Sequence, residues 1–330
     1  MSWSMTLTSH AADDSSMRAI VARSFGGPEV LQLEQVQRPE LIPTQVLVRV
    51  IAAGVNPIDA KTRSGGGFAP EAGPLPHIPG WEFSGVVEKT GFGVTRFQPG
   101  DEVFGMPFFP RPGRAYAEYV TAPSRQLALK PANLTHAQAA GLPLAGLTAW
   151  QLLVDTAKIG PGQRVLIHAA AGGVGHLAVQ IARARGAYVI GTASSAKHDL
   201  VTGLGAHEVI DYTAASFEDA AGIVDVVVDL VGGDTRLRSL DVLREDGLLL
   251  PVPRGLDVSE EAARRGIRVQ PMIVEPDYRG LEELAAMVRD KALTIRVETT
   301  LPLEQAAQAH RALESGHATG KTVLLAAAES

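Results

Sequence analysis

A short apolar run, a glycine-rich turn and a helical pattern follow one another between residues 164 and 183. The apolar residues 165–167 predict a buried strand, and the three glycines within residues 172–175 predict a tight turn. The apolar positions that follow lie on one face of a helix: Val174, Leu177, Ala178 and Ile181. Backbone N–H groups at the start of such a helix converge at the positive end of its dipole, where an anion such as a pyrophosphate fits.

Strand and helix patterns alternate in the chain after residue 161. The expected strands are 165–168, 188–191, 208–211, 225–230, 247–252 and 267–272. Such alternation predicts a parallel sheet wound on both faces, and six strands are the number in a complete dinucleotide-binding sheet.

Residues 17 to 135 instead carry alternating apolar segments between turns rich in glycine and proline, which predicts a compact, partly open barrel. Thr135 and Gln138 form a capping box, and the helical pattern that it opens runs to about residue 158. Towards the C-terminus we expect helices near 281–291 and 303–315 and a strand at 321–325. This α/β chain is therefore expected to divide into a disordered tail (1–16), a β domain (17–135), a dinucleotide-binding domain (136–274) and a C-terminal segment (275–330).

Composition narrows the classes of partner. The 330 residues are 45% hydrophobic, enough for two sizeable cores, and the net charge is −6 without basic blocks, which argues against nucleic acid. Cysteine is absent, which excludes disulfides and thiolate metal sites and fits a cytoplasmic location. We expect neither a secretory signal at the N-terminus nor a membrane span, because no apolar run reaches the length of about 18 residues that a span needs.

The glycine turn matches the dinucleotide fingerprint G-x-G-x-x-G, with Ala170 in place of the first glycine. Gly172 would let the backbone approach a pyrophosphate, and Gly175 would let the helix pack close to the strand. The alternative is an ordinary strand-to-helix turn with structural glycines. The turn residues predicted to bind the cofactor are Ala170, Ala171, Gly172, Gly173, Val174 and Gly175.

The end of the next strand predicts which dinucleotide binds. An NAD site usually places an acid there, on the ribose 2′-hydroxyl. This chain has Ser194, Ser195, Lys197 and His198 instead, which suit a 2′-phosphate and predict NADPH over NADH. Alternatively, Ser194 caps the following helix while Lys197 is solvated.

Several motifs together carry a resemblance that spans nearly everything after Met17. They lie at 54–61 (GVNPIDAK), 79–85 (PGWEFSG), 146–149 (GLTA), 169–175 (AAAGGVG), 205–212 (GAHEVIDY) and 320–324 (GKTVL). The chain resembles the zinc-free quinone oxidoreductase (zeta-crystallin-like) branch of the medium-chain dehydrogenase/reductase superfamily. The resemblance implies a GroES-like β-barrel domain plus a Rossmann doubly wound parallel sheet, with the C-terminal segment returning to the barrel.

The resemblance also implies NADPH-dependent reduction of a quinone or of an alkene conjugated to a carbonyl, by a homodimer. By that analogy Tyr212 would lie beside the adenosine phosphate, and Thr148 and Asn56 near the nicotinamide. Val231 and Gly232 would approach the nicotinamide ribose from the sheet.

No metal is expected in this chain. Zinc-dependent relatives use a cysteine where Asn56 stands and a histidine where Trp81 stands, and the nine histidines show no short metal-ligand spacing. His168 and His176, on either side of the glycine turn, are interpreted as packing or helix-start residues. Without a Lewis acid, quinones and enones are better substrates than alcohols.

Reduction of an enone produces an enolate whose oxygen needs hydrogen-bond donors. Asn56 is the first candidate, with the alternative that it only holds the turn before Pro57. Lys61 and Tyr116 are candidate proton donors. The alternatives are that Lys61 is a solvated surface residue, which base rates favour, and that water supplies the proton.

Two further charged residues have expected roles near this site. Asp59 is interpreted as a cap of the helix or turn that follows it. Lys321 is predicted to bind the cofactor, although an ion pair with Glu82 is equally compatible with the sequence. Two other functions stay open: an enoyl reductase acting on acyl thioesters, and a non-catalytic NADPH-binding protein.

Overall fold

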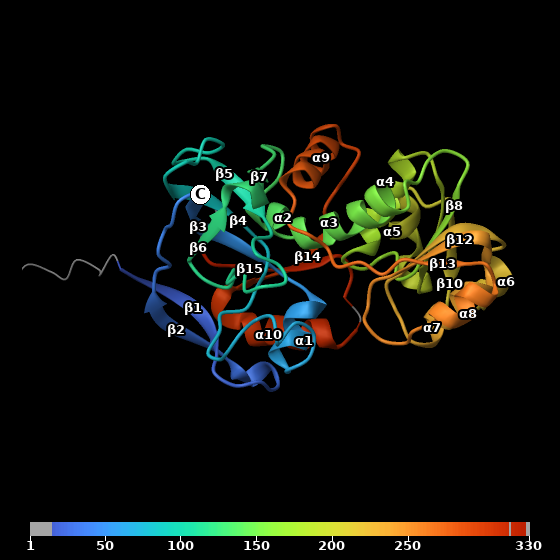
Figure 1. The fold of residues 1–330 in the computed structure, drawn as a ribbon, viewed down its shortest axis with the longest axis horizontal. Helices are drawn as coiled ribbons and strands as arrows, with labels where there is room; N and C mark the ends of the chain where they lie inside the picture. Colours follow the sequence, from blue (N-terminus) through green and yellow to red (C-terminus); the bar gives the residue numbers. More distant parts are fainter. Residues whose placement is uncertain (1–14, 317, 328–330) are drawn as a thin grey trace, which may run out of the picture.

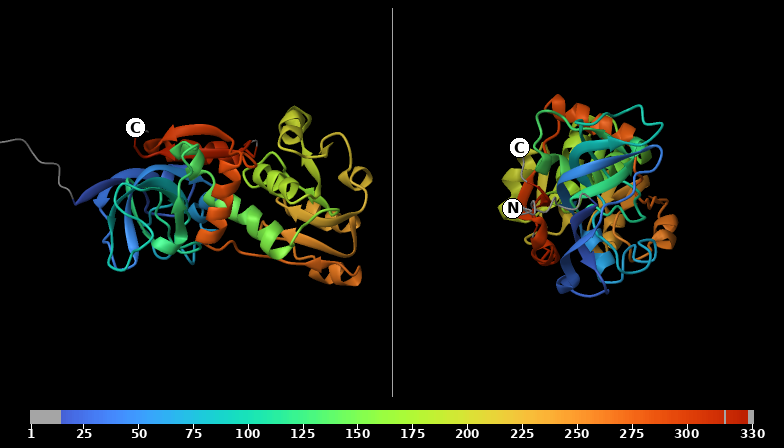
Figure 2. Two further views of the ribbon diagram at one scale, coloured as in Figure 1. Left: turned by 90° about the horizontal axis from the view of Figure 1, so that it is seen from above. Right: turned by 90° about the vertical axis from the view of Figure 1, so that its left-hand side faces the viewer.

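The computed structural model describes residues 15–316 and 318–327. A barrel-like half and a half with a parallel sheet lie side by side along the long axis of the molecule (Figures 1 and 2). Most of the expected N-terminal tail lies outside the described residues, and the first strand begins at Ser16.

The barrel half contains a two-stranded and a seven-stranded sheet. The small sheet pairs β1 (Ser16–Ala22) with β2 (Leu31–Gln37). The larger sheet has the order β14-β15-β3-β4-β5-β7, with β6 also paired to β3. Its strands are β3 (Gln45–Val55), β4 (Phe83–Thr90), β5 (Glu102–Gly105), β6 (Tyr119–Pro123), β7 (Leu127–Leu129), β14 (Val297–Pro302) and β15 (Lys321–Leu325).

The C-terminal strand β15 pairs antiparallel with β3, so the end of the chain returns to the barrel as expected. The sequence reading missed β14, which lies beside β15. Helices α1 (Pro57–Arg63) and α10 (Ala306–Glu314) cover the same side of this half (Figure 1).

The helical stretch expected from Thr135 to residue 158 is not one helix. The predicted capping box is present, with the Gln138 N–H donating to Thr135 Oγ1 at 3.1 Å. It opens the short α2 (His136–Ala140), which ends because Pro143 has no N–H to continue the helical ladder. The chain continues as α3 (Pro143–Trp150) and a π-helical turn (Gln151–Thr156).

The other half contains the predicted six-stranded sheet in the order β10-β9-β8-β11-β12-β13, with every pair parallel. This is the strand order of a Rossmann sheet, the fold that the resemblance implies. The strands are β8 (Arg164–Ile167), β9 (Tyr188–Ala193), β10 (Glu208–Asp211), β11 (Val224–Asp229), β12 (Leu243–Pro251) and β13 (Arg268–Val269). β13 is shorter than the expected 267–272, because Pro271 cannot donate to a sheet ladder.

Helices cover this sheet and link it to the barrel half (Figure 1). They are α4 (Gly175–Ala184), α5 (His198–Gly203), α6 (Phe217–Ala220), α7 (Asp234–Arg238), α8 (Ser259–Arg264) and α9 (Tyr278–Arg289). α9 packs on α3 and on β7, so it contacts the barrel half. Among the described residues, no helix has the length and apolar character needed to cross a membrane.

Candidate functional site

The glycine turn joins β8 to α4, and its shape requires glycine at position 175. A Cβ at Gly175 would lie 2.2 Å from the backbone oxygen of Ala169 and 2.8 Å from Cα of Ala170. No side chain fits at such distances, because α4 starts directly against the end of the strand. The close helix–strand packing predicted for Gly175 is present.

Backbone amides are available at the start of α4. The Gly172 N–H donates to Ala169 O at 2.9 Å, and the His176 N–H donates to Gly172 O at 3.0 Å. For the amides of residues 173–175, which lie between them, no acceptor is recorded in the described part of the chain. These donors at the positive end of the α4 dipole fit the pyrophosphate of a dinucleotide.

The two histidines beside the turn are structural, as interpreted from the sequence. His176 Nδ1 lies 2.9 Å from Gly172 O, and its Nε2 lies 3.3 Å from the amide nitrogen of Arg296. His168 lies between Thr192 and Ser239, at 3.2 and 3.0 Å from their hydroxyl oxygens. Burial lowers the pKa of each histidine to about 4, so both are neutral near pH 7.

The predicted 2′-phosphate residues follow β9 directly. Ser194 occupies the N-cap position of a short 3₁₀ turn, but its hydroxyl makes no capping hydrogen bond within the described residues. Lys197 is half-buried, with Nζ 3.5 Å from Ala318 O. The sequence reading missed Asp211, which pairs in register with Ala193 and whose pKa is lowered mainly by hydrogen bonds from Thr213, with a smaller contribution from Ser195. A carboxylate therefore borders the predicted phosphate site.

The loop after β11, predicted to lie near the nicotinamide ribose, is held by a buried carboxylate that the sequence reading also missed. Asp229 accepts hydrogen bonds from the backbone amides of Val231 (3.0 Å) and Gly232 (2.7 Å). It also pairs with Arg236 at 2.7 Å. The available signal was an acid at the end of a parallel strand, three residues before a pair of glycines.

A buried cluster of three polar side chains lies in the barrel half. Asn56 Nδ2 donates to Glu82 Oε1 at 2.7 Å, and Asn56 Oδ1 accepts from Lys321 Nζ at 2.5 Å. Lys321 Nζ also pairs with Glu82 Oε1 at 2.9 Å. Of the two interactions that the sequence allowed for Lys321, the ion pair with Glu82 is therefore present. All three residues are almost completely buried, with at most 3% of each exposed.

This Asn56–Glu82–Lys321 cluster is tied to the surrounding elements. Glu82 Oε2 accepts the backbone N–H of Leu144 at 2.7 Å, near the start of α3. Gly54 leaves the room that Glu82 needs, because a Cβ there would lie 2.2 Å from Glu82 Oε1. Thr148, one helical turn after Leu144, donates its hydroxyl back to Leu144 O at 2.7 Å.

Lys321 connects the cluster with the glycine turn. A Cβ at Gly173 would lie 3.3 Å from Lys321 Cδ, so the lysine stem passes next to the turn. The preceding residue, Gly320, donates its N–H to Ala171 O at 2.9 Å. The start of β15 therefore contacts the predicted pyrophosphate site while its lysine side chain ends at Asn56.

The two candidate proton donors, Lys61 and Tyr116, lie in different surroundings. Lys61 is exposed on α1. Tyr116 is completely buried, and its hydroxyl lies 3.3 Å from His310 Nε2. Burial raises the pKa of Tyr116 well above its usual value, so this phenol is neutral near pH 7. The catalytic roles of both residues stay predictions.

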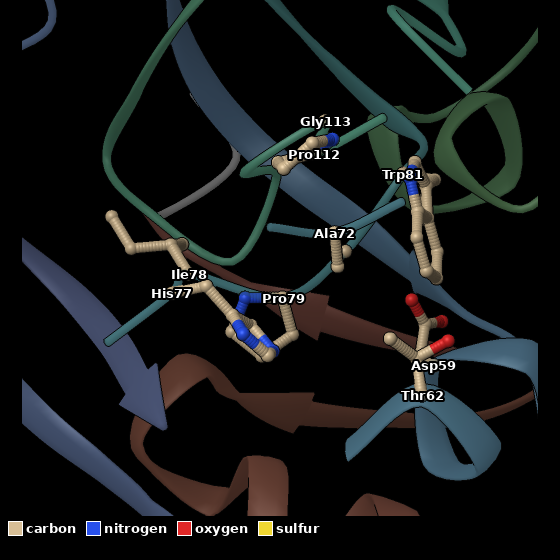
Figure 3. A pocket seen from close by; sticks show the side chains of 10 residues that line it. Asp59, Thr62, Ala72, His77, Ile78, Pro79, Trp81, Pro112 and Gly113 are labelled. Carbon is tan, nitrogen blue, oxygen red and sulfur yellow. The ribbon is translucent and has the colours of Figure 1, made fainter. Parts of the chain in front are cut away.

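Asp59 takes part in capping α1, but it lies inside that helix, whereas the sequence predicted it in a loop before the helix. Its Oδ2 accepts the N–H of the N-cap residue Asn56 at 2.7 Å. Figure 3 shows Asp59 below the Trp81 ring. Together with Thr62, His77 and Gly80, both residues line a cavity whose volume is about 10 Å³. That volume is the room of about one water molecule, so a quinone cannot occupy this cavity as it stands.

Trp81 is held in place rather than free to turn. Its Nε1–H donates to Arg111 O at 2.8 Å, and its ring meets the edge of Phe109 at 5.3 Å between centroids. Within the described residues, no group of three or more His, Cys, Asp or Glu side chains could hold a metal ion.

Two protein families match segments of this chain. Residues 42–132 match the alcohol dehydrogenase GroES-like domain, and residues 204–324 match the family described as zinc-binding dehydrogenase. The first match covers most of the barrel strands, and the second runs from the parallel sheet into β15.

Known proteins resemble the chain along almost its whole length. An NADPH-dependent alkenal/one oxidoreductase of Arabidopsis thaliana is 36% identical over 97% of this chain and 82% of its own. The solved quinone oxidoreductase of Coxiella burnetii is 40% identical with a TM-score of 0.89, over 94% of this chain and 99% of its own. The Escherichia coli quinone oxidoreductase, solved in complex with NADPH, is 30% identical with a TM-score of 0.83, over the same shares.

Proposed function

Because the chain belongs to the zinc-free quinone oxidoreductase branch of the medium-chain dehydrogenase/reductase superfamily, we propose that it transfers a hydride from NADPH to a quinone or to an alkene conjugated to a carbonyl. The observation that carries this proposal is the position of Lys321. Its stem lies against the glycine turn and its ammonium lies on Asn56, so one side chain joins the cofactor turn to the candidate donor.

NADPH, when bound, supplies the hydride. For its pyrophosphate we propose the backbone of Ala170, Ala171, Gly172, Gly173, Val174 and Gly175. For its 2′-phosphate and adenosine we propose Ser194, Ser195, Lys197 and Tyr212, and for its nicotinamide end Asn56, Thr148, Val231, Gly232 and Lys321. The buried Asp229 supports this set, because it fixes the amides of the loop that contains Val231 and Gly232.

The cluster can stabilise negative charge on a substrate oxygen. Asn56 Nδ2 carries two hydrogens, of which Glu82 takes one, and Lys321 Nζ carries three, of which Asn56 and Glu82 take two. The remaining donors stand in a buried place, where hydrogen bonds to a developing charge are stronger than in water. We propose that Asn56 donates to the oxygen that becomes negative when the hydride arrives.

The test is a coenzyme-oxidation assay with three classes of acceptor. Purified protein is mixed with NADPH and with phenanthrenequinone, an α,β-unsaturated ketone or crotonyl-CoA, and absorbance at the coenzyme band is followed. We expect turnover with the quinone or the ketone and at least about tenfold less with the thioester. A preference for the thioester would favour an enoyl reductase, and tight NADPH binding without any turnover would favour a non-catalytic binding protein.

We also propose that the chain forms a homodimer in the cytoplasm. We expect the two chains to meet at an edge of the parallel sheet, whose outer strands are β10 and β13. Light scattering of the purified protein measures the mass, and a mass near 34.8 kDa, that of one chain, would contradict the dimer.

A further inference from the structure

Asp59 has one carboxyl oxygen that the hydrogen bonds of the described residues leave unused. Its Oδ2 accepts the Asn56 N–H at 2.7 Å, whereas its Oδ1 is buried and has no hydrogen-bond partner there. The side chain is 1% exposed and lies behind Asn56, on the same turn of chain. Because this buried carboxyl lies next to the candidate donor and has an oxygen without a hydrogen bond, its state of ionisation affects the site.

A chain of side chains points a single hydroxyl hydrogen at this carboxyl. Arg63 can only donate, and its Nη1 lies 3.3 Å from His310 Nδ1, so Nδ1 accepts and Nε2 carries the hydrogen. That hydrogen points to Tyr116 Oη, 3.3 Å away. The hydroxyl hydrogen of Tyr116 is then available to Asp59, and this interaction lowers the pKa of Asp59 against the larger, opposite effect of burial.

The charges around Asp59 nearly balance without it. Lys321 on β15 pairs with Glu82 before β4, and Arg63 on α1 pairs with Glu314 on α10, so each of these cations has its own carboxylate. His77, which lines the same cavity, has a pKa lowered by burial and is neutral near pH 7. An ionised Asp59 therefore has no cation of its own, and burial raises its pKa to about 7.

We propose that Asp59 is a positioning residue behind Asn56 and that it supports the reaction in its protonated, neutral form. Hydride transfer to an enone forms a C–H bond and moves an electron pair onto the carbonyl oxygen next to Asn56. A neutral Asp59 leaves the Asn56–Glu82–Lys321 cluster free to stabilise that charge, whereas a carboxylate would repel it. Asp59 keeps its proton throughout, and the proton that completes the product comes from solvent. This inference rests on the proposed function.

The first test is the pH dependence of turnover at saturating NADPH and acceptor, from about pH 5 to about pH 9. We expect turnover of the wild type to fall above about pH 7, approaching tenfold for each pH unit. Asp59→Asn, which has the same shape and no charge, should keep the acid-side rate within about threefold and lose this decline. Asp290→Asn, at an exposed acid after α9, is the matched control and should follow the wild type.

A second variant tests the same proposal if Asp59→Asn does not fold. Tyr116→Phe removes the hydroxyl that favours the carboxylate, so the midpoint of the decline should move to higher pH. Three results would overturn the proposal: a flat profile for the wild type, a parallel decline in Asp59→Asn, or loss of its turnover at every pH with NADPH binding intact.

A readout without substrate separates this inference from the proposed function. Because the folded pKa of Asp59 lies above its ordinary value of 3.8, folded protein binds more protons than unfolded protein between about pH 4 and about pH 7. The urea midpoint of the wild type should therefore fall relative to that of Asp59→Asn as pH rises through this window. A chain that shows this difference but reduces no acceptor would refute the function alone, and a constant difference would refute the protonated Asp59.

Discussion

At the scale of single residues, the ion pair between Lys321 and Glu82 dominates the candidate site. The two side chains are 2% and 0% exposed, so both charges have lost nearly all their water. In such pairs the loss of hydration can exceed the Coulomb attraction, and the pair as a whole adds little stability. What it provides here is a fixed position for Asn56, which accepts from the lysine and donates to the glutamate.

Removing only the cation tests this view. Lys321→Met leaves Glu82 buried with an uncompensated charge, so we expect the free energy of unfolding to drop by about 3–5 kcal/mol. Adding Glu82→Gln removes that charge and should recover part of the loss, but turnover should stay low in both variants because Asn56 has lost its anchor. Urea unfolding and the coenzyme-oxidation assay measure the two effects. Lys89→Met, at an exposed position on β4, is the control, and an equal loss in that variant would contradict the argument.

At the scale of elements, the turn between β8 and α4 depends on the absence of a side chain at Gly175. The strand ends and the helix begins so close together that a Cβ at Gly175 meets backbone atoms, which cannot turn away as a flexible side chain could. The amides of the turn are in place only while this contact is short.

Gly175→Ala should therefore push α4 away from the strand. We expect a loss of about 1–3 kcal/mol in stability and a rise in the dissociation constant for NADPH of at least about tenfold. Gly203→Ala is the matched control in α5, because a Cβ there has no neighbour within 4 Å, and it should be neutral or slightly stabilising. Unchanged NADPH affinity in Gly175→Ala, measured by fluorescence titration, would rule out this turn as the pyrophosphate site.

The elements that depend on local pattern could be predicted from the sequence. The β8–turn–α4 unit, the Thr135 cap and the final strand β15 are where periodicity and turn residues place them. The Lys321–Glu82 pair joins positions far apart in the chain, so no local signal could choose it over cofactor contact. Asp211 could not be predicted as a neighbour of the proposed phosphate site, because its position beside Ala193 follows from the strand register, which spacing along the chain does not show.

At the scale of the whole molecule, the C-terminal segment holds the two halves together at the glycine turn. β15 belongs to the barrel sheet, yet Gly320 at its start bonds to Ala171 of the turn. The His176 ring adds a second contact through the backbone of Arg296, just before β14. A dinucleotide bound at this predicted pyrophosphate site would therefore lie where both halves meet, and we expect the two halves to respond to it together.

This arrangement predicts a single thermal transition that NADPH moves upward. At about one hundred times its dissociation constant a ligand of the folded state adds about 2.7 kcal/mol, which shifts Tm by several degrees in a chain of this size. NADH should shift Tm less at equal concentration, because it lacks the 2′-phosphate that we assign to Ser194, Ser195 and Lys197. Lys197→Ala should reduce the NADPH shift and leave the NADH shift unchanged, since a charged contact contributes about 1.5–3 kcal/mol. Scanning calorimetry decides between the outcomes: equal shifts for both coenzymes would remove the phosphate assignment, and no shift with either would remove the dinucleotide site itself.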